Sequence, residues 1–281
     1  MKLVRYGAPG AERPGLVDAE GRIRDLSAHV ADIAGEALTP AGLDRLAEID
    51  PVTLPLVDGS PRFGPCVGQV GKFLCIGLNY SDHATETGAT VPPEPVLFTK
   101  ATSAIIGPND DVAIPRGSVK TDWEVELGIV IGKAAKYVSE ADAEVHIAGY
   151  CLINDVSERE YQLERHGTWD KGKGCDTFGP IGPWLVTRDE IADVNNLPMW
   201  LEVNGHRYQD GNTVTMVYKP AFIVHYLSQF MTLHPGDVIS TGTPPGVGMG
   251  QKPPVYLKAG DVMELGIDGL GTQRQAVVAN A

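Results

Sequence analysis

The sequence lacks several features that would assign it to whole classes of protein. Its 281 residues contain no basic stripe, and the formal net charge of −13 argues against a nucleic-acid partner. No apolar run is long enough to cross a bilayer, and no signal-peptide pattern opens the chain. We therefore expect no membrane partner and a cytoplasmic location. Low-complexity tracts and repeats of solenoid length are also missing.

Cysteine is scarce as well. The four cysteines are Cys66, Cys75, Cys151 and Cys175, and no two of them form a CxxC pair. This favours free thiols in a reducing compartment over a disulfide framework or a zinc site.

The loop TGTPPGVGMG, residues 241–250, lacks the strand–G-x-G-x-x-G–helix context of a dinucleotide site. With 43% hydrophobic residues, the chain has the composition of an ordinary globular protein.

The chain divides into a small leading module, residues 1–67, and a larger part, residues 68–281. In the module, MKLVRY predicts a strand and GLVDAEGRIRDL predicts a hairpin that turns at Asp18–Gly21. Thr39, followed by a proline, predicts the N-cap of a short helix. Four prolines and two glycines in residues 51–65 indicate a linker. We expect this module to serve packing or association.

Strands predominate in the larger part. The segments KFLCIGLNY, PVLFTK and GYCLINDVS predict strands, and WLEVNGHRY predicts a hairpin with Asn204 and Gly205 at its turn. PAFIVHYLSQFMTL has the apolar spacing of an amphipathic helix. Asp237 and Asp261 each lie in a Gly-Asp turn before a strand, so we interpret them as turn residues rather than ligands.

The stretch TDWEVELGIVIG, residues 121–132, alternates with period two. One face would carry Trp123, Val125, Leu127, Ile129 and Ile131, and the other would carry Glu124 and Glu126. Carboxylates at i and i+2 of a strand lie roughly 7 Å apart along the backbone and can lean onto one cation. A hard divalent ion such as Mg²⁺ takes such oxygen ligands. A half-solvated antiparallel strand shows the same alternation, so both interpretations stay open.

Two further features bear on that choice. Asp155 ends the strand GYCLINDVS and could join the paired glutamates, although such a residue is more often part of a turn. Three converging carboxylates would need a cation between them. His83 and Glu86, three residues apart, could form an imidazole base oriented by a carboxylate, or a surface pair.

Two capping-box spacings predict short helices, at Ser157–Glu160 and at Thr187–Glu190. On the first of these helices, Arg159 and Gln162 could face a ligand or form a solvated face. Lys173 stands in the glycine-flanked segment DKGKGCDTFGP. A lysine in such a loop is usually solvated, although glycines let a backbone approach a ligand closely.

Five motifs occur in a fixed order: NYSDHATE, DWEVELGIVIG, GYCLINDVSEREYQ, KGKGCDTFGPIGP and GDVISTGTPPGVG. Together they resemble the fumarylacetoacetate hydrolase family over about residues 70–281, and most closely its acylpyruvate and diketo-sugar-acid hydrolases. The resemblance implies a β-rich α+β fold with a mixed, rolled sheet, and a homodimer. The leading module fits the small N-terminal domain that such proteins often carry.

The resemblance also implies a role for each candidate residue. Glu124, Glu126 and Asp155 match ligands of Mg²⁺, or alternatively Mn²⁺. His83 and Glu86 match a water-activating dyad, with Lys173 as a third catalytic residue. Arg159, Gln162, Lys173 and Thr243 match substrate contacts. Gly174-Cys175 departs from the bulkier pair common in the family, and Glu158 adds charge beside Arg159, which leaves the choice of substrate open.

The implied reaction cleaves a carbon–carbon bond of a 2,4-diketo acid, a small anionic 2-oxo acid, to give pyruvate and a second acid. Oxaloacetate decarboxylation and a ureidoglycolate lyase or hydratase activity share the scaffold and remain alternatives. A non-catalytic β protein that binds a metal or a small acid is a rival from another class. The combination of His83 and Glu86 with three acidic ligand positions counts against that rival.

Overall fold

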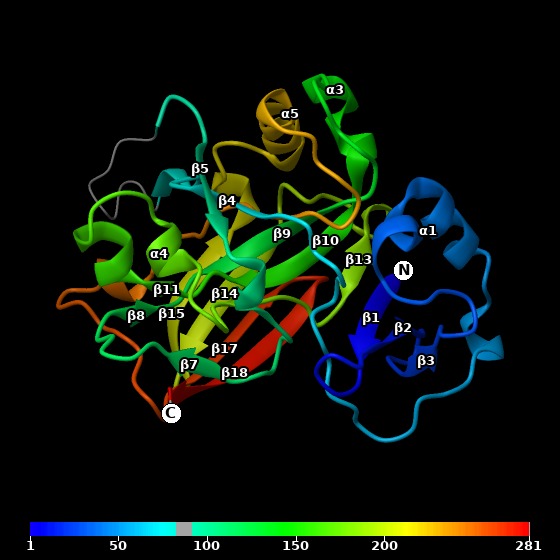
Figure 1. The fold of residues 1–281 in the computed structure, drawn as a ribbon, viewed down its shortest axis with the longest axis horizontal. Coiled ribbons are helices and arrows are strands. Elements are labelled where there is room, and N and C mark those ends of the chain that lie inside the picture. Colours follow the sequence, from blue (N-terminus) through cyan, green and yellow to red (C-terminus); the bar gives the residue numbers. More distant parts are fainter. Residues whose placement is uncertain (83–91, 281) are drawn as a thin grey trace.

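Strands form most of the regular structure over residues 1–82 and 92–280, which the computed structural model describes. They build a nine-stranded sheet and a five-stranded sheet, seen in Figure 1. Each sheet contains one parallel pair of strands among antiparallel pairs. The helices are short and lie around the sheets. The prediction of a β-rich α+β fold with mixed sheets is confirmed.

The order across the nine-stranded sheet is β3 (Ile23–Asp25), β2 (Arg13–Val17), β1 (Lys2–Tyr6), β13 (Leu185–Thr187), β10 (Ile147–Asn154), β9 (Val125–Ile131), β16 (Val238–Ser240), β4 (Phe73–Gly77) and β5 (Val96–Lys100). The five-stranded sheet has the order β15 (His206–Asn212), β14 (Pro198–Val203), β17 (Val262–Ile267), β18 (Gly271–Ala279) and β7 (Val112–Ile114). Two short pairs join β8 (Thr121–Asp122) to β11 (Ser157–Glu158) and β6 (Ile105–Ile106) to β12 (Gly179–Pro180).

The α-helices that lie within the described residues are α1 (Pro40–Ala47), α3 (Glu140–Ala143), α4 (Asp170–Lys173) and α5 (Pro220–Phe230). A π-helix spans Glu160–Glu164. Single 3₁₀ turns occur at Gly35–Leu38, Pro51–Thr53, Thr102–Ala104, Glu144–His146, Arg188–Glu190, Thr213–Thr215 and Gly248–Gly250. Over the described part of the chain, no helix is long and apolar enough to cross a membrane.

The period-two pattern around β9 builds the core. The residues predicted to share one face, Trp123, Val125, Leu127, Ile129 and Ile131, are all fully buried in one apolar cluster that also contains side chains of β14, β17 and β18. Glu124 and Glu126 lie on the other face, yet they are only 6% and 3% exposed. The half-solvated interpretation of this strand is therefore wrong.

The leading residues extend the nine-stranded sheet, because β1 pairs with β13. They also share a second apolar cluster with the centre of the sheet, in which Leu3 and Leu26 pack together with Ile153 and Val238. The predicted hairpin of β2 and β3 is confirmed, and so is the predicted cap of α1, where Thr39 Oγ1 accepts a hydrogen bond from Gly42 N at 3.1 Å. The domain boundary at residue 67 stays a prediction.

Several local predictions in the larger part are also confirmed. Asn204 and Gly205 form the turn between β14 and β15 with φ values of 53° and 77°, which suit a two-residue hairpin. Asp237 accepts backbone hydrogen bonds from Lys72 and His234 and is a turn residue. The predicted amphipathic helix is α5, and the cysteines, all of which are described, are free thiols.

Both capping-box predictions are wrong, because other partners take the two hydroxyl groups. Ser157 lies in β11, and its Oγ donates to Asp155 O at 2.9 Å. The helix that follows is only the five-residue π-helix and has no side-chain cap. Thr187 ends β13, and its Oγ1 accepts a hydrogen bond from the amino terminus at 2.5 Å. Only a 3₁₀ turn follows it.

Gly149, at the bulge in β10, allows β13 to approach closely. A Cβ atom at this position would lie 2.1 Å from the carbonyl oxygen of Val186, a backbone atom that cannot move away cheaply. We expect Gly149→Ala to lower the free energy of unfolding by about 1–3 kcal/mol, the usual cost of overpacking. Chemical denaturation measures this.

Gly71→Ala is the matched control, because its new Cβ would meet only the end of the Asp237 side chain, at 3.1 Å. Asp237, which is held by Lys72 and His234, would need to shift only by a few tenths of an ångström, so the cost should be clearly smaller than that of Gly149→Ala. Equal stability of the two variants would contradict the close packing of β10 on β13.

Candidate active site and metal centre

The pairing of β9 with β10 places Asp155 opposite Glu124. The two strands are antiparallel, with Ile153 paired to Glu126. The same register, continued two residues beyond this pair, sets Asp155 opposite Glu124. Asp155 N donates a hydrogen bond to Glu124 O at 2.9 Å. The β8–β11 pair continues the same alignment beyond them. Strand register therefore brings together carboxylates that are about thirty residues apart.

Glu124, Glu126 and Asp155 form one cluster. Each offers a carboxylate oxygen, and these oxygens all lie within 4.8 Å of one another. All three residues are buried. Burial and mutual repulsion both oppose three negative charges at such distances, so the cluster requires positive charge close by.

Two lysines supply part of that charge. Lys173 Nζ lies 2.6 Å from Glu124 Oε2 and 2.7 Å from Asp155 Oδ2. Lys100 Nζ lies 2.5 Å from Asp155 Oδ1. Lys173 is buried at the end of α4, so the expectation of a solvated loop lysine is wrong. The glycine beside it serves backbone packing, since a Cβ on Gly172 would lie 2.3 Å from Glu158 O.

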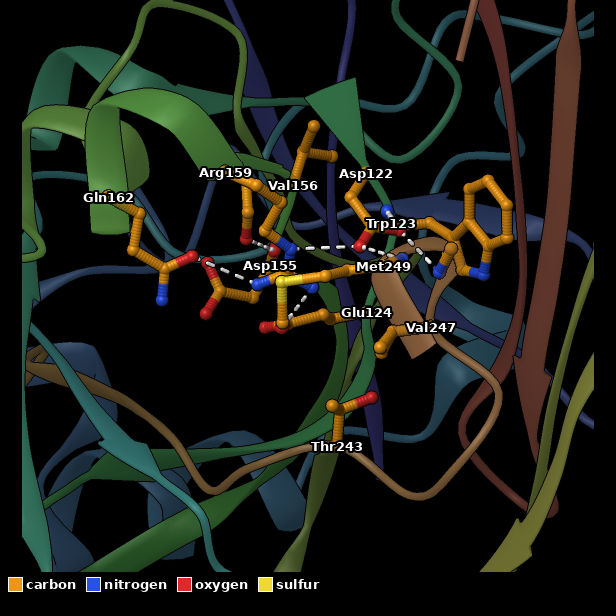
Figure 2. A network of polar contacts seen from close by, with 12 residues as sticks. Asp122, Trp123, Glu124, Asp155, Val156, Arg159, Gln162, Thr243, Val247 and Met249 are labelled. Carbon is orange, nitrogen blue, oxygen red and sulfur yellow. Dashed lines mark hydrogen bonds and ion pairs between the residues drawn. The ribbon is translucent and has the colours of Figure 1, made fainter. Parts of the chain in front are cut away.

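Arg159 supplies the third positive charge and links the cluster to its surroundings (Figure 2). Its Nε lies 2.8 Å from Asp122 Oδ2, and its Nη2 lies 2.7 Å from Glu124 Oε1. Its Nη1 donates to Gln162 Oε1 at 3.0 Å. Arg159 and Gln162 are therefore neighbours, as their spacing predicted, but they are buried and do not form a solvated face.

The electrostatic balance differs between the two glutamates. Burial acts to raise the pKa of Glu124, but Lys173 and Arg159 outweigh it and lower that pKa to about 2. Burial, followed by the charges of Asp155 and Glu124, raises the pKa of Glu126 well above its usual value. Glu126 Oε2 accepts hydrogen bonds from Ser240 Oγ at 2.5 Å and from Gly242 N at 2.8 Å. Within the described residues, no cationic side chain pairs with Glu126.

The donor set fits a divalent cation. With Glu126 ionised, as metal binding requires, Glu124, Glu126, Asp155 and Asp122 carry one negative charge more than Lys100, Lys173 and Arg159 neutralise. Carboxylate oxygens are the ligands that hard divalent ions prefer. Glu124, Glu126 and Asp155 could hold such an ion, and its two charges would leave the site with a net positive charge for an anionic ligand.

A cavity of about 250 Å³ opens beside the carboxylates, and Thr243 lines it together with Arg159, Gln162 and Lys173. Thr243 Oγ1 donates to Val125 O at 2.9 Å and accepts from Gln209 Nε2 at 2.8 Å. All the predicted substrate-contact residues therefore border one space. A second cavity, of about 290 Å³, lies beside α1 and away from the three carboxylates. His83 and Glu86 lie outside the described residues.

Three residues of this network were not predicted. Asp122 accepts hydrogen bonds from Gly248 N at 2.7 Å and Met249 N at 2.9 Å, and so holds the 241–250 loop against the site. It precedes Glu124 by two residues, so the same period-two pattern could have identified it. Lys100 and Ser240 come from β5 and β16, and no spacing in the sequence connects them to the glutamates.

Comparison with known proteins assigns the family. Residues 72–278 match the model of the fumarylacetoacetate (FAA) hydrolase C-terminal family, so the chain belongs to this family. A Burkholderia multivorans relative, provisionally named a hydrolase, is 68% identical, and the match covers 98% of both chains.

Two solved structures show the same fold over 100% of both chains. Fumarylacetoacetate hydrolase from psychrophilic Exiguobacterium antarcticum has a TM-score of 0.88 and 35% identity. Maleylpyruvate hydrolase from a Sphingobium species, in complex with manganese(II) and pyruvate, has a TM-score of 0.83 and 28% identity. The resemblance inferred from the five motifs is thus confirmed. The manganese ion bound by the second of these structures is consistent with a divalent metal site at the acidic cluster of this chain.

Glu126→Gln should weaken binding of Mn²⁺ by more than about tenfold, since losing even an outer-shell partner of a metal site costs 10–100-fold. The amide keeps the size of the side chain and a carbonyl acceptor for Ser240 and Gly242. Isothermal titration calorimetry measures the affinity. Glu264→Gln, on the partly exposed face of β17, is the matched control and should bind Mn²⁺ like the unmodified protein. Equal affinity of the two variants would exclude Glu126 as a ligand.

Lys100→Met should destabilise the protein by about 2–3 kcal/mol, because Asp155 keeps Lys173 but loses the other buried ammonium group that compensates its charge. Lys100 and Asp155 are both fully buried. Lys120→Met removes the surface pair with Glu164 and should cost at most about 1 kcal/mol. Urea denaturation in the absence of divalent ions compares them, and a cost for Lys100→Met as small as the control would contradict the role of this lysine.

Proposed function

We propose that this protein is a metal-dependent hydrolase that cleaves the bond between C3 and C4 of a 2,4-diketo acid. The products are pyruvate, or a pyruvate-like acid, and a second acid. The observation that carries this proposal is the convergence of three buried carboxylates beside Lys173 and Arg159, at a cavity of suitable size, in a chain of this family. The relative solved with manganese and pyruvate supports the substrate class.

Glu124, Glu126 and Asp155 are the proposed ligands of Mg²⁺, with Mn²⁺ as the alternative ion. When bound, the ion supplies the Lewis acidity that stabilises negative charge as it develops on the oxo acid. Arg159 and Gln162 bind the carboxylate end of the substrate, and Thr243 borders the same space. Ser240 and Gly242 hold Glu126 in its orientation through their hydrogen bonds to Oε2.

The His83–Glu86 pair takes a proton from a water molecule, which attacks the C4 carbonyl carbon. This role rests on the sequence motif, and general base catalysis by a histidine suits neutral pH. Collapse of the adduct breaks the C3–C4 bond, and the carbonyl carbon leaves as the second acid. The electron pair of that bond moves onto the C3–C2–O unit of the pyruvate fragment, which then takes up a proton at C3.

Lys173 is placed to act on that fragment. Its ammonium group is fixed by Glu124 and Asp155 and borders the cavity, so it can donate a hydrogen bond to the developing anion or return the proton. Burial acts to lower the pKa of Lys173, but Asp155 and Glu124 outweigh it and keep that pKa above its usual value. The raised pKa favours the charged form of Lys173 beside these two carboxylates. A homodimer and a cytoplasmic location stay predictions.

Purified protein should release pyruvate from an acylpyruvate in the presence of Mg²⁺ or Mn²⁺, and EDTA should abolish the release. A coupled lactate dehydrogenase assay detects the pyruvate. His83→Ala should reduce kcat by about 10²–10⁴-fold, the usual contribution of a general base, while calorimetric Mn²⁺ affinity stays unchanged.

Oxaloacetate is the discriminating substrate, because its decarboxylation needs the metal but no activated water. If pyruvate is released from oxaloacetate but not from an acylpyruvate, and His83→Ala does not change that release, the protein is a decarboxylase and the hydrolase proposal is wrong. Acylpyruvate turnover that survives His83→Ala within about tenfold would show that the dyad assignment is wrong.

A further inference from the structure

Two chemical kinds of side chain line the cavity beside the carboxylates. Its charged and hydrogen-bonding groups gather where Glu124, Arg159 and Lys173 meet. The remaining lining side chains include six that are apolar: Ile76, Leu78, Phe98, Leu163, Trp169 and Met249. We call these six side chains the apolar wall. A substrate whose oxo-acid end contacts the charged groups would place its other end mainly against the apolar wall.

Close packing fixes part of the apolar wall. The rings of Trp169 and Phe98 have their centroids 5.3 Å apart at an interplanar angle of 58°, a tilted aromatic pair. Trp169 also fills the space left by Gly77, where a Cβ atom would lie only 2.4 Å from the indole Cζ3. Gly77 thus makes room for the indole, and the wall is built by side chains that support one another.

The cations near this wall are already engaged: Lys173 Nζ lies 5.0 Å from the centroid of the Phe98 ring, but Glu124 and Asp155 hold it. Among the described residues that line the cavity, the cations are Arg159 and Lys173, and both are already paired with carboxylates. The nearby Arg165 pairs with Glu160, and Lys171 donates to backbone carbonyl groups.

We infer that the preferred substrate carries a short, apolar acyl group, and that the apolar wall selects against an acyl group ending in a carboxylate. This inference rests on the proposed function. A cavity of about 250 Å³ corresponds to roughly eight water molecules in liquid volume, which suits a small diketo acid. A carboxylate placed against the wall would lose its hydration without gaining a partner, and that loss is large for a charged group.

Butanoylpyruvate and succinylpyruvate test the inference, since they differ only in a terminal methyl or carboxylate. We expect kcat/KM for butanoylpyruvate to exceed that for succinylpyruvate by about a hundredfold or more, as an unpaired buried charge would cause. Equal values, or a preference for succinylpyruvate, would overturn the inference while leaving the hydrolase proposal intact. If neither these two substrates nor other acylpyruvates yield pyruvate, the hydrolase proposal and the inference are both overturned.

A charge introduced into the wall provides a second test. Leu163 follows Gln162 on the π-helix and is 49% exposed, so Leu163→Arg should be tolerated by the fold. We expect it to raise kcat/KM for succinylpyruvate by about tenfold or more relative to butanoylpyruvate. Leu56→Arg is the matched control, because Leu56 is 47% exposed but does not line the cavity, and it should leave the ratio unchanged.

Thermal unfolding of both variants shows whether they are folded. A folded Leu163→Arg variant with an unchanged ratio would overturn the placement of the acyl group at this wall. If Leu163→Arg does not fold, the ratio measured with the unmodified protein decides alone.

Discussion

The concentration of negative charge where β9 meets β10 constrains the rest of the site. Glu124, Glu126 and Asp155 are held together by strand register, and burial denies them the solvent that would weaken their repulsion. The fold answers with cations from elsewhere: Lys100 from β5, Lys173 from α4, and Arg159 from the residue before the π-helix. Each of these elements is short, and each is oriented so that one buried cation reaches the same cluster.

The same constraint explains why buried polar contacts hold one side of the site together. Asp122 pairs with Arg159 and also accepts backbone hydrogen bonds from Gly248 and Met249. Arg159 in turn pairs with Glu124. The proposed ligand, the proposed substrate contact and the loop that lines the cavity thus belong to one network, so displacing any member removes one partner from a buried charge.

Sequence reasoning succeeded where the periodicity of one segment sufficed and failed where partners came from elsewhere. Alternation placed Trp123 and Glu124 on opposite faces of the segment that leads into β9, but it could not reveal that both faces are buried. Ser157 and Thr187 have the spacing of helix caps, yet strand pairing and the amino terminus take their hydroxyl groups. Lys100 is fully buried at the end of an unremarkable strand, and only the arrangement of the sheet brings it to Asp155.

The charge balance also shows why a divalent ion suits this site better than a fourth basic residue. The protein carries a formal net charge of −13, which repels an anionic substrate at long range. One further ammonium group would only neutralise the surplus carboxylate of Glu126. An ion with two charges would leave the site positive inside an otherwise negative molecule, and it accepts oxygen ligands from substrate, which an ammonium group cannot do. The same divalent ion would then both attract a small 2-oxo acid and stabilise the charge that develops as its bond breaks.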